Sequence, residues 1–142
     1  MRLTMRPTIR TVSAHCDLPC GVYDPAQARI EAQSVKAMQE KYQGNDDPVF
    51  RERAVTIIGE RADLVKHHLS VLWGDYFKPP HFEKYPELHG LFNETIKKAS
   101  GTGAKNSTDP ATGQALLDGI DRIATIFWET KDKEYALPQS AA

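Results

Sequence analysis

The sequence predicts an all-α protein, an antiparallel up-down four-helix bundle preceded by an N-terminal segment that carries both cysteines. Asp-Pro pairs mark three helix starts, and apolar residues recur at steps of three and four, as they do along one face of a helix. No stretch of useful length alternates apolar and polar residues as a half-buried strand would. Short connections between helices of this length make neighbouring helices antiparallel.

The length and composition fit one globular domain. The chain has 142 residues, of which 40% are hydrophobic and 26% are charged, so it can bury a core of its own. No apolar run approaches the roughly 20 residues that a bilayer span requires. The net charge is −1, and the chain after residue 14 is mildly acidic, which argues against nucleic acid or an anionic membrane as a partner.

Residues 1–14, MRLTMRPTIRTVSA, form a basic leader. They contain Arg2, Arg6 and Arg10, no acidic residue, and small residues at the end. The leader lacks the apolar centre of about 7 residues that a secretory signal needs, so we interpret it as a cytoplasmic pro-segment that is removed on maturation. A frayed N-terminus that stays attached is the alternative. The mature chain would then be residues 15–142.

Each helix has a start signal. We expect helices near residues 24–43, 48–76, 86–100 and 109–132. Three starts place an N-cap carboxylate before a proline at the first helical position, at Asp24-Pro25, Asp47-Pro48 and Asp109-Pro110. The remaining start is marked by Pro86, after the turn-rich stretch FKPPHFEKYP.

Apolar stripes support the last two helices. The first stripe consists of Leu88, Leu91, Phe92, Thr95, Ile96 and Ala99. The second consists of Leu116, Leu117, Ile120, Ile123, Ala124 and Phe127. Both follow the helical period, so we expect both to face the core.

The stripes of the first two helices each include a charged residue. Glu31 falls between Ala28 and Val35, and Arg61 occupies the equivalent place on the second helix. A charge on a buried stripe needs a partner, so one interpretation pairs Glu31 with Arg61 or with a polar site. The other places each residue at the edge of its stripe, with the charged end in water.

The stretch SAHCDLPCGVYDP, residues 13–25, holds both cysteines of the chain, Cys16 and Cys20. Three interpretations compete. A disulfide would close too short a loop to stabilise much, and a cytoplasmic location disfavours it. A structural zinc site wants four ligands, of which this spacing supplies two. The third interpretation is a compact, redox-active metal hook.

The backbone favours the hook, which we define as residues 15–23. Pro19 prevents both thiols from lying along one helical turn, and Gly21 lets the chain turn away toward the first helix. If the leader is cut after Ala14, the α-amine of His15, the amide nitrogen of Cys16 and the two thiolates form a planar N2S2 set, with the His15 imidazole as an axial ligand. Planar donors of this kind select nickel(II) or copper(II).

The hook resembles that of the nickel-containing superoxide dismutase family. Six residues match every fixed position of the family pattern, namely His15, Cys16, Pro19, Cys20, Gly21 and Tyr23. The stretches VKHHLSVLWGDYFKPPHFEKYPELH and DPATG also look like the family. The resemblance covers roughly residues 15–132.

The resemblance implies an enzyme that converts superoxide to oxygen and hydrogen peroxide by cycling one nickel ion per subunit between Ni(II) and Ni(III). It implies His15, Cys16 and Cys20 as metal ligands. It further implies that Glu31 and Arg61 hold the His15 imidazole by hydrogen bonds. Family members are homohexamers, and removal of the leader implies a maturation protease as a partner; the expected cytoplasmic location rests on the leader alone.

The resemblance also supplies catalytic residues beside the metal. Asp17 and Tyr23 match residues of the hook pocket, and Tyr23 lines the approach of the substrate. Lys78 is a candidate to steer the anionic substrate, although a solvated surface lysine is the ordinary alternative.

Two other function classes compete with the superoxide dismutase interpretation. A di-iron bundle enzyme requires Glu-x-x-His motifs, and no glutamate here has a histidine three residues later. A cluster of histidines, namely His67, His68, His81 and His89, has solvent-facing or core-edge positions as its default interpretation. A nickel or copper carrier, which would use the same hook without turnover, stays open as the non-enzyme alternative.

Overall fold

The computed structural model describes residue 18 and residues 20–137, and every regular element within them is helical. Four long helices form the body: α1 (Ala26–Gln43), α2 (Pro48–Val71), α4 (Leu88–Lys98) and α5 (Pro110–Glu129). Three short elements connect them: a π-helix, η1 (Leu72–Tyr76), the helix α3 (Pro79–Lys84) and a 3₁₀ turn, η2 (Ala104–Asn106).

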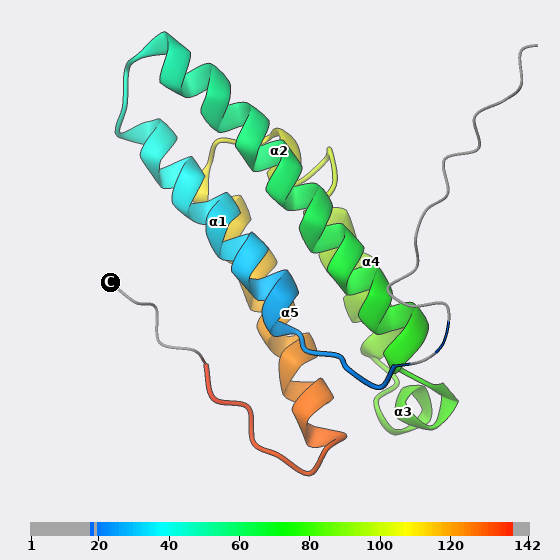
Figure 1. Cartoon of the computed structure of the whole chain (residues 1–142). Helices are drawn as coiled ribbons and strands as arrows, with labels where there is room; N and C mark the ends of the chain where they lie inside the picture. Colours follow the sequence, from blue (N-terminus) through cyan, green and yellow to red (C-terminus); the bar gives the residue numbers. More distant parts are fainter. Residues whose placement is uncertain (1–17, 19, 138–142) are drawn as a thin grey trace, which may run out of the picture.

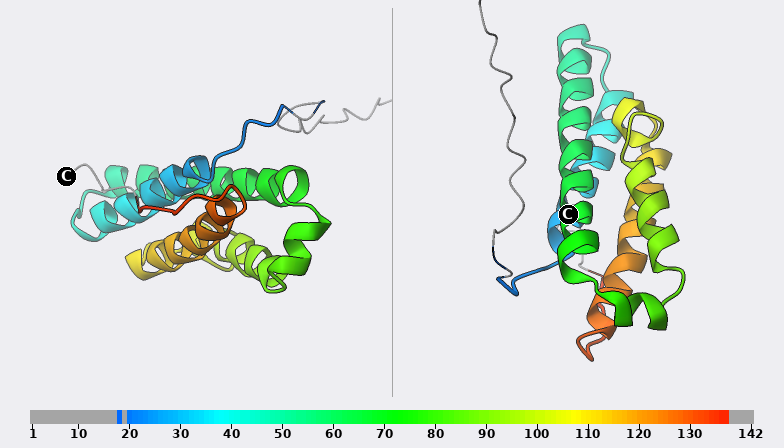
Figure 2. Two further views of the ribbon diagram at one scale, coloured as in Figure 1. Left: turned by 90° about the horizontal axis from the view of Figure 1, so that it is seen from below. Right: turned by 90° about the vertical axis from the view of Figure 1, so that its right-hand side faces the viewer.

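The long helices run up and down in chain order (Figure 1). Helix α1 packs against α2 and α5, and α4 packs against α5 and α2, so each long helix has two long neighbours. Seen from below, α1 and α2 form one layer over α4 and α5 (Figure 2). The predicted all-α bundle is confirmed. None of the helices within the described residues is long and apolar enough to cross a membrane.

Two of the Asp-Pro pairs, Asp47-Pro48 and Asp109-Pro110, start helices as predicted, whereas the first prediction was wrong by one residue, since Pro25 and not Asp24 is the N-cap of α1. The Asp47 carboxylate accepts a hydrogen bond from the Phe50 amide at 3.2 Å, and that of Asp109 accepts one from Ala111 at 2.9 Å. At the start of α1, Asp24 accepts a hydrogen bond from the amide of Ala26 at 2.8 Å. These bonds satisfy amides that have no partner inside the helix.

The core follows the predicted stripes. On α5 the whole predicted stripe is buried, and on α4 Leu88, Phe92, Thr95 and Ala99 are buried. Burial of each large apolar side chain of this kind stabilises the fold by about 1.5–3 kcal/mol. Close helix approach depends on small residues, since a Cβ at Gly113 would lie 2.5 Å from Oε1 of Gln39 on α1.

The connection between α2 and α4 differs from the prediction. The stretch FKPPHFEKYP was expected to be a turn, but its middle forms α3, which begins at Pro79. That prediction was wrong because proline, interpreted as a breaker, also fits the first positions of a helix. Pro86 marks the next start only approximately, since α4 begins at Leu88.

The last turn of the predicted second helix is a π-helix. The amide of Phe77 donates to the carbonyl of Leu72 at 3.0 Å, which spans five residues instead of the α-helical four. Single π-turns of this kind often occur at functional sites. Here the π-turn determines where Tyr76 and the residues after it lie.

Candidate metal centre

The predicted site residues divide between the described and the undescribed parts of the chain. Cys20, Tyr23, Glu31, Arg61 and Lys78 are described. The predicted ligands His15 and Cys16, together with Asp17 and Pro19, lie outside the described residues. Within residue 18 and residues 20–137, no three His, Cys, Asp or Glu side chains form a metal-binding group.

Cys20 lies at the surface, at a sharp backbone turn. Its sulfur accepts a hydrogen bond from the amide of Val22 at 3.5 Å, and its thiol donates to the carbonyl of the same residue at 3.8 Å. The next residue, Gly21, has a φ of +73°, in the left-handed region that favours glycine. A Cβ there would meet nothing within 4 Å, so the requirement for glycine is conformational. The predicted turn at Gly21 is confirmed.

A pocket of about 260 Å³ lies beside this turn. We call it the hook pocket, and its lining residues are Gly21, Tyr23, Asp75, Tyr76, Lys78 and His81. The Tyr23 and Tyr76 rings form one wall, with their centroids 5.7 Å apart. The pocket therefore joins the end of the hook to η1 and α3, which are distant in sequence.

Sequence reasoning identified only part of this lining. It selected Tyr23 and Lys78 but missed Asp75, Tyr76 and the role of His81, to which it gave only a solvent-facing or core-edge position. All three missed residues fall in the stretch GDYFKPPH, which belongs to a longer segment that resembled the family as a whole. The resemblance located the segment but did not indicate which of its side chains reach the hook.

Tyr76 is fixed from the far side by α5. Its hydroxyl lies 2.5 Å from Oγ1 of Thr130, and that Oγ1 donates to the carbonyl of Phe127 at 2.6 Å. Because Thr130 uses its one proton on Phe127, Tyr76 donates to Thr130. Nζ of Lys131 lies 5.3 Å from the centroid of the Tyr76 ring. The wall of the hook pocket is thus tied to the end of α5.

His81 is held in one tautomer. Its Nδ1 accepts a hydrogen bond from the amide of Lys78 at 3.1 Å, so the proton resides on Nε2. The ring stacks on Tyr76 with centroids 5.7 Å apart and planes 10° apart. Burial, followed by the charges of Lys78 and Lys84, lowers the pKa of His81 below its usual 6.5. His81 is therefore a neutral donor at pH 7.

Glu31 and Arg61 pair across α1 and α2. Nη1 of Arg61 lies 3.1 Å and 3.4 Å from the two carboxylate oxygens of Glu31. The Glu31 side chain is 17% exposed and that of Arg61 is 37% exposed. The interpretation that pairs these two charges is confirmed. Their predicted contact with His15 involves a residue outside the described part of the chain.

The three remaining described histidines each lie against another ring. The His89 ring stacks on Phe82 with centroids 3.7 Å apart, and its Nδ1 accepts a hydrogen bond from the indole of Trp73 at 3.0 Å. His67 and His68 lie edge to face, with centroids 5.3 Å apart. His89 is exposed, so it has the solvent-facing or core-edge position that was its default interpretation.

Comparison with known protein families matches residues 10–131 to the nickel-containing superoxide dismutases. A nickel superoxide dismutase of Streptomyces coelicolor is 72% identical over 121 residues, which are 85% of this chain and 91% of that protein. The corresponding protein of Streptomyces seoulensis is 70% identical over 120 residues, 84% of this chain and 90% of that one.

Solved structures give the same result. A native nickel superoxide dismutase structure, at 1.30 Å resolution, has a TM-score of 0.80 and 70% identity, and covers 84% of this chain and 100% of its own. A structure whose nickel ligation corresponds to the oxidised state has a TM-score of 0.80 and 68% identity, with the same coverage.

Proposed function

We propose, because the chain belongs to the nickel-containing superoxide dismutase family, that it converts superoxide to oxygen and hydrogen peroxide. The observation that carries the proposal is the family match over residues 10–131, which includes the whole hook and the four long helices. The hook pocket adds local support, since it places Lys78 and two tyrosines beside the turn that follows Cys20.

The donors of the hook fit nickel. The α-amine and imidazole of His15, the amide nitrogen and thiolate of Cys16, and the thiolate of Cys20 would hold the metal, one ion per subunit. A planar set of two nitrogens and two sulfurs suits nickel(II). When bound, nickel supplies a one-electron Ni(II)/Ni(III) couple that takes an electron from one superoxide and returns it to another. The Val22 amide, which donates to the Cys20 sulfur, supports this fit because such a donor stabilises a thiolate.

Glu31 and Arg61 are proposed to orient the His15 imidazole. One Arg61 nitrogen binds both Glu31 oxygens, which leaves other guanidinium N–H groups and carboxylate lone pairs for a further partner. An imidazole that ligates a metal ordinarily binds a carboxylate or carbonyl through its second nitrogen, which fixes the tautomer and the ring orientation. A partly buried Glu31 suits that role.

The hook pocket is proposed as the approach for superoxide. Lys78 attracts the anion, and the neutral His81 offers an Nε2–H donor without adding charge. The rings of Tyr23 and Tyr76 form one wall of the pocket, and we propose that they restrict access to small molecules such as superoxide. Asp17 is proposed to act with Tyr23 at the hook, as the family resemblance implies.

Removal of the leader is proposed to create the site. In the uncut chain, the nitrogen of His15 belongs to a peptide bond and is a poor ligand. The native solved structure aligns over its whole length with 84% of this chain, so the remaining part of this chain has no counterpart in that structure. A maturation protease that cuts after Ala14 would expose the amine that the metal needs.

We further propose that the protein assembles as a homohexamer and acts in the cytoplasm. Several large apolar side chains are exposed, and we propose that they lie at contacts of a homohexamer; they include Val22, Ile30, Val49, Val55 and Trp73. Light scattering of the mature protein tests this assembly. Unoxidised thiolates require a reducing compartment, so we propose the cytoplasm.

The direct test of function uses the nickel-loaded chain that begins at His15 and its Cys20→Ser variant. The proposal predicts rapid superoxide consumption by the first and loss of both bound nickel and activity in the second. A Ser34→Ala variant, which removes an exposed hydroxyl bonded only to its own helix, is a matched control that should keep full activity. An active Cys20→Ser variant would overturn the proposal.

A further inference from the structure

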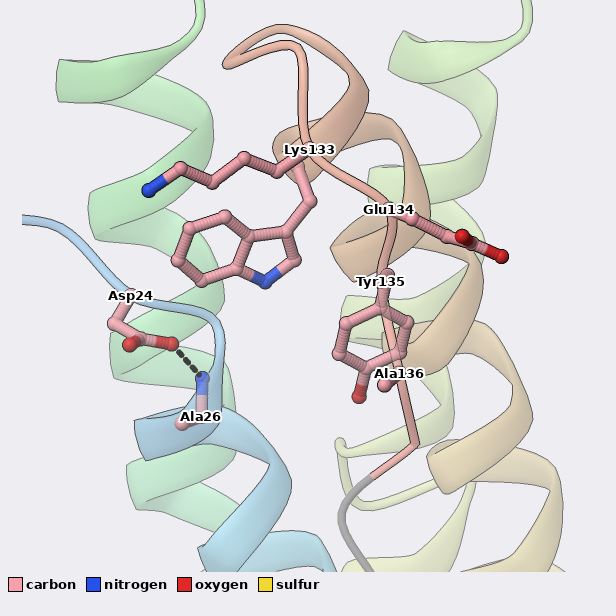
Figure 3. A pocket seen from close by; sticks show the side chains of 7 residues that line it. Asp24, Ala26, Lys133, Glu134, Tyr135 and Ala136 are labelled. Carbon is pink, nitrogen blue, oxygen red and sulfur yellow. Dashed lines mark hydrogen bonds between the residues drawn. The ribbon is translucent and has the colours of Figure 1, made fainter.

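The chain reverses direction at the end of α5. The amide of Lys133 donates to the carbonyl of Trp128 at 2.9 Å, and that of Asp132 donates to Glu129 at 3.1 Å. Asp132 has a φ of 54°, so these bonds form a Schellman motif with an aspartate in the left-handed position. The reversal directs residues 133–137, which we call the strap, back between α1 and α5 (Figure 3).

The strap lies beyond the part of the chain that matches the family, which ends at residue 131. Its contacts are therefore not explained by the family match. One of them connects the strap, through Asp121 on α5, to α1, the helix that follows the hook.

Tyr135 anchors the strap. Its hydroxyl donates to Oδ1 of Asp121 on α5 at 2.9 Å. The same oxygen accepts a hydrogen bond from Nε of Arg29 on α1 at 2.7 Å. Burial, with a further contribution from the hydrogen bond to Asp121, raises the pKa of Tyr135 to about 12. The hydroxyl thus stays a donor at neutral pH, and one carboxylate oxygen joins strap, α5 and α1.

Arg29 lies in the first turn of α1, directly after the hook. Its amide donates to the carbonyl of Pro25 at 3.1 Å, and Pro25 follows the last hook residue by two positions. The Arg29 side chain is 12% exposed, and within the described chain its buried Nη1 has no hydrogen-bond partner. Asp121 is therefore the group that holds this guanidinium in place.

The rest of the strap stands away from α1. A pocket of about 420 Å³ separates Asp24 and Ala26 from the strap, with Trp128 as a further wall (Figure 3). Nζ of Lys133 lies 5.7 Å from the centroid of the Trp128 ring, so Lys133 packs over another residue that lines this pocket. Because this pocket interrupts the packing, the Tyr135–Asp121–Arg29 contact carries much of the connection between strap and α1.

We propose that Tyr135 is a positioning residue that, through Asp121 and Arg29, fixes the first turn of α1 and thereby slows the release of nickel from the hook. The statement about nickel rests on the proposed function. The statement about α1 rests only on the contacts described above.

The test compares Tyr135→Phe, which keeps the ring and removes the hydroxyl, with a matched control. Lys105→Met removes another hydrogen-bonded pair, the 2.7 Å contact with Asp63, without touching α1 or the strap. Hydrogen exchange of residues 24–29 is measured in the full chain. The rate of nickel transfer to a chelator is measured for the loaded protein that begins at His15.

We expect Tyr135→Phe to raise both the exchange rate and the nickel release rate by roughly three- to ten-fold, the effect of losing one hydrogen bond, and Lys105→Met to change neither. Unchanged exchange in Tyr135→Phe would overturn the proposal. Faster exchange with unchanged nickel release would overturn the link to the hook. If the unsubstituted protein bound no nickel, the proposed function would fail, while the exchange arm would still decide whether Tyr135 fixes α1.

Discussion

The guanidinium of Arg61 on α2 lies 3.1 Å from the carboxylate of Glu31 on α1. Each of these residues is the charged member of an otherwise apolar stripe on its helix. The pair lies between α1 and α2, the first two helices after the hook. Its value for stability is modest, because Arg61 is 37% exposed and partly exposed pairs contribute little. We therefore interpret the pair chiefly as support for the His15 imidazole.

Glu31→Gln tests that role. The variant keeps the shape of the side chain and removes the charge that would bind the imidazole N–H. We expect nickel to remain bound and superoxide consumption to fall about 10- to 100-fold, the usual cost of losing such a supporting contact. Pulse radiolysis measures the rate and metal analysis the occupancy. Full activity in this variant would contradict the assignment, and Lys105→Met serves as the control for loss of a surface ion pair.

Gly21→Ala tests the turn after Cys20. The left-handed φ of +73° costs an alanine about 1–2 kcal/mol, although a Cβ there would meet nothing within 4 Å. We expect roughly ten-fold weaker nickel binding, measured by competition with a chelator. The matched control is Gly59→Ala, in the interior of α2, where a Cβ also meets nothing and alanine should raise the melting temperature. Equal nickel affinities in both variants would show that the turn is not needed.

His81 gives a pH dependence of stability. Its pKa in the folded protein is lower than the usual 6.5. At pH values near and below 6.5, the unfolded chain therefore binds more protons at this residue than the folded protein does. The contribution of neutral His81 is complete above pH 6.5 and is lost as the pH falls through the folded-state pKa. Urea unfolding between pH 5 and 7.5 should show a smaller slope of stability against pH in His81→Gln. An identical slope would mean that other groups dominate.

Thr130→Val tests the support of Tyr76. Valine keeps the volume of threonine and removes the acceptor of the 2.5 Å hydrogen bond from the Tyr76 hydroxyl. The half-buried phenol then loses its partner, which should lower the free energy of unfolding by about 1 kcal/mol. Urea denaturation measures the change, and Thr56→Val, at a threonine bonded only to its own helix, is the control. A stability equal to that of the unsubstituted protein would show that Tyr76 does not depend on Thr130.

Much of the fold could be predicted because its signals are local. The Asp-Pro pairs start α2 and α5, and the stripes of α4 and α5 face the core. Helix α3 was missed because Pro79 and Pro80 serve equally as turn residues and as the first residues of a helix. The π-turn before Phe77 has no sequence signature that separates it from an ordinary helix end.

The residues of the site could be predicted only where a sequence motif or a charged residue on an apolar stripe indicated them. The hook residues follow a fixed pattern, and Glu31 and Arg61 stood out as charges on apolar stripes. Tyr76 and Tyr135 carried no such signal, since each depends on a partner from another element. The bond between Arg29 and Asp121 joins residues 92 positions apart, and no local pattern reports a contact of that range.

We propose that the hook becomes an active nickel site once the leader is removed. The most direct measurement is superoxide consumption by two preparations, one that begins at His15 and one that retains residues 1–14, each offered nickel, copper or zinc. We expect activity only in the trimmed, nickel-loaded protein. Tight nickel binding without turnover would contradict it and favour a metal carrier, and equal activity with the leader in place would refute the role of processing.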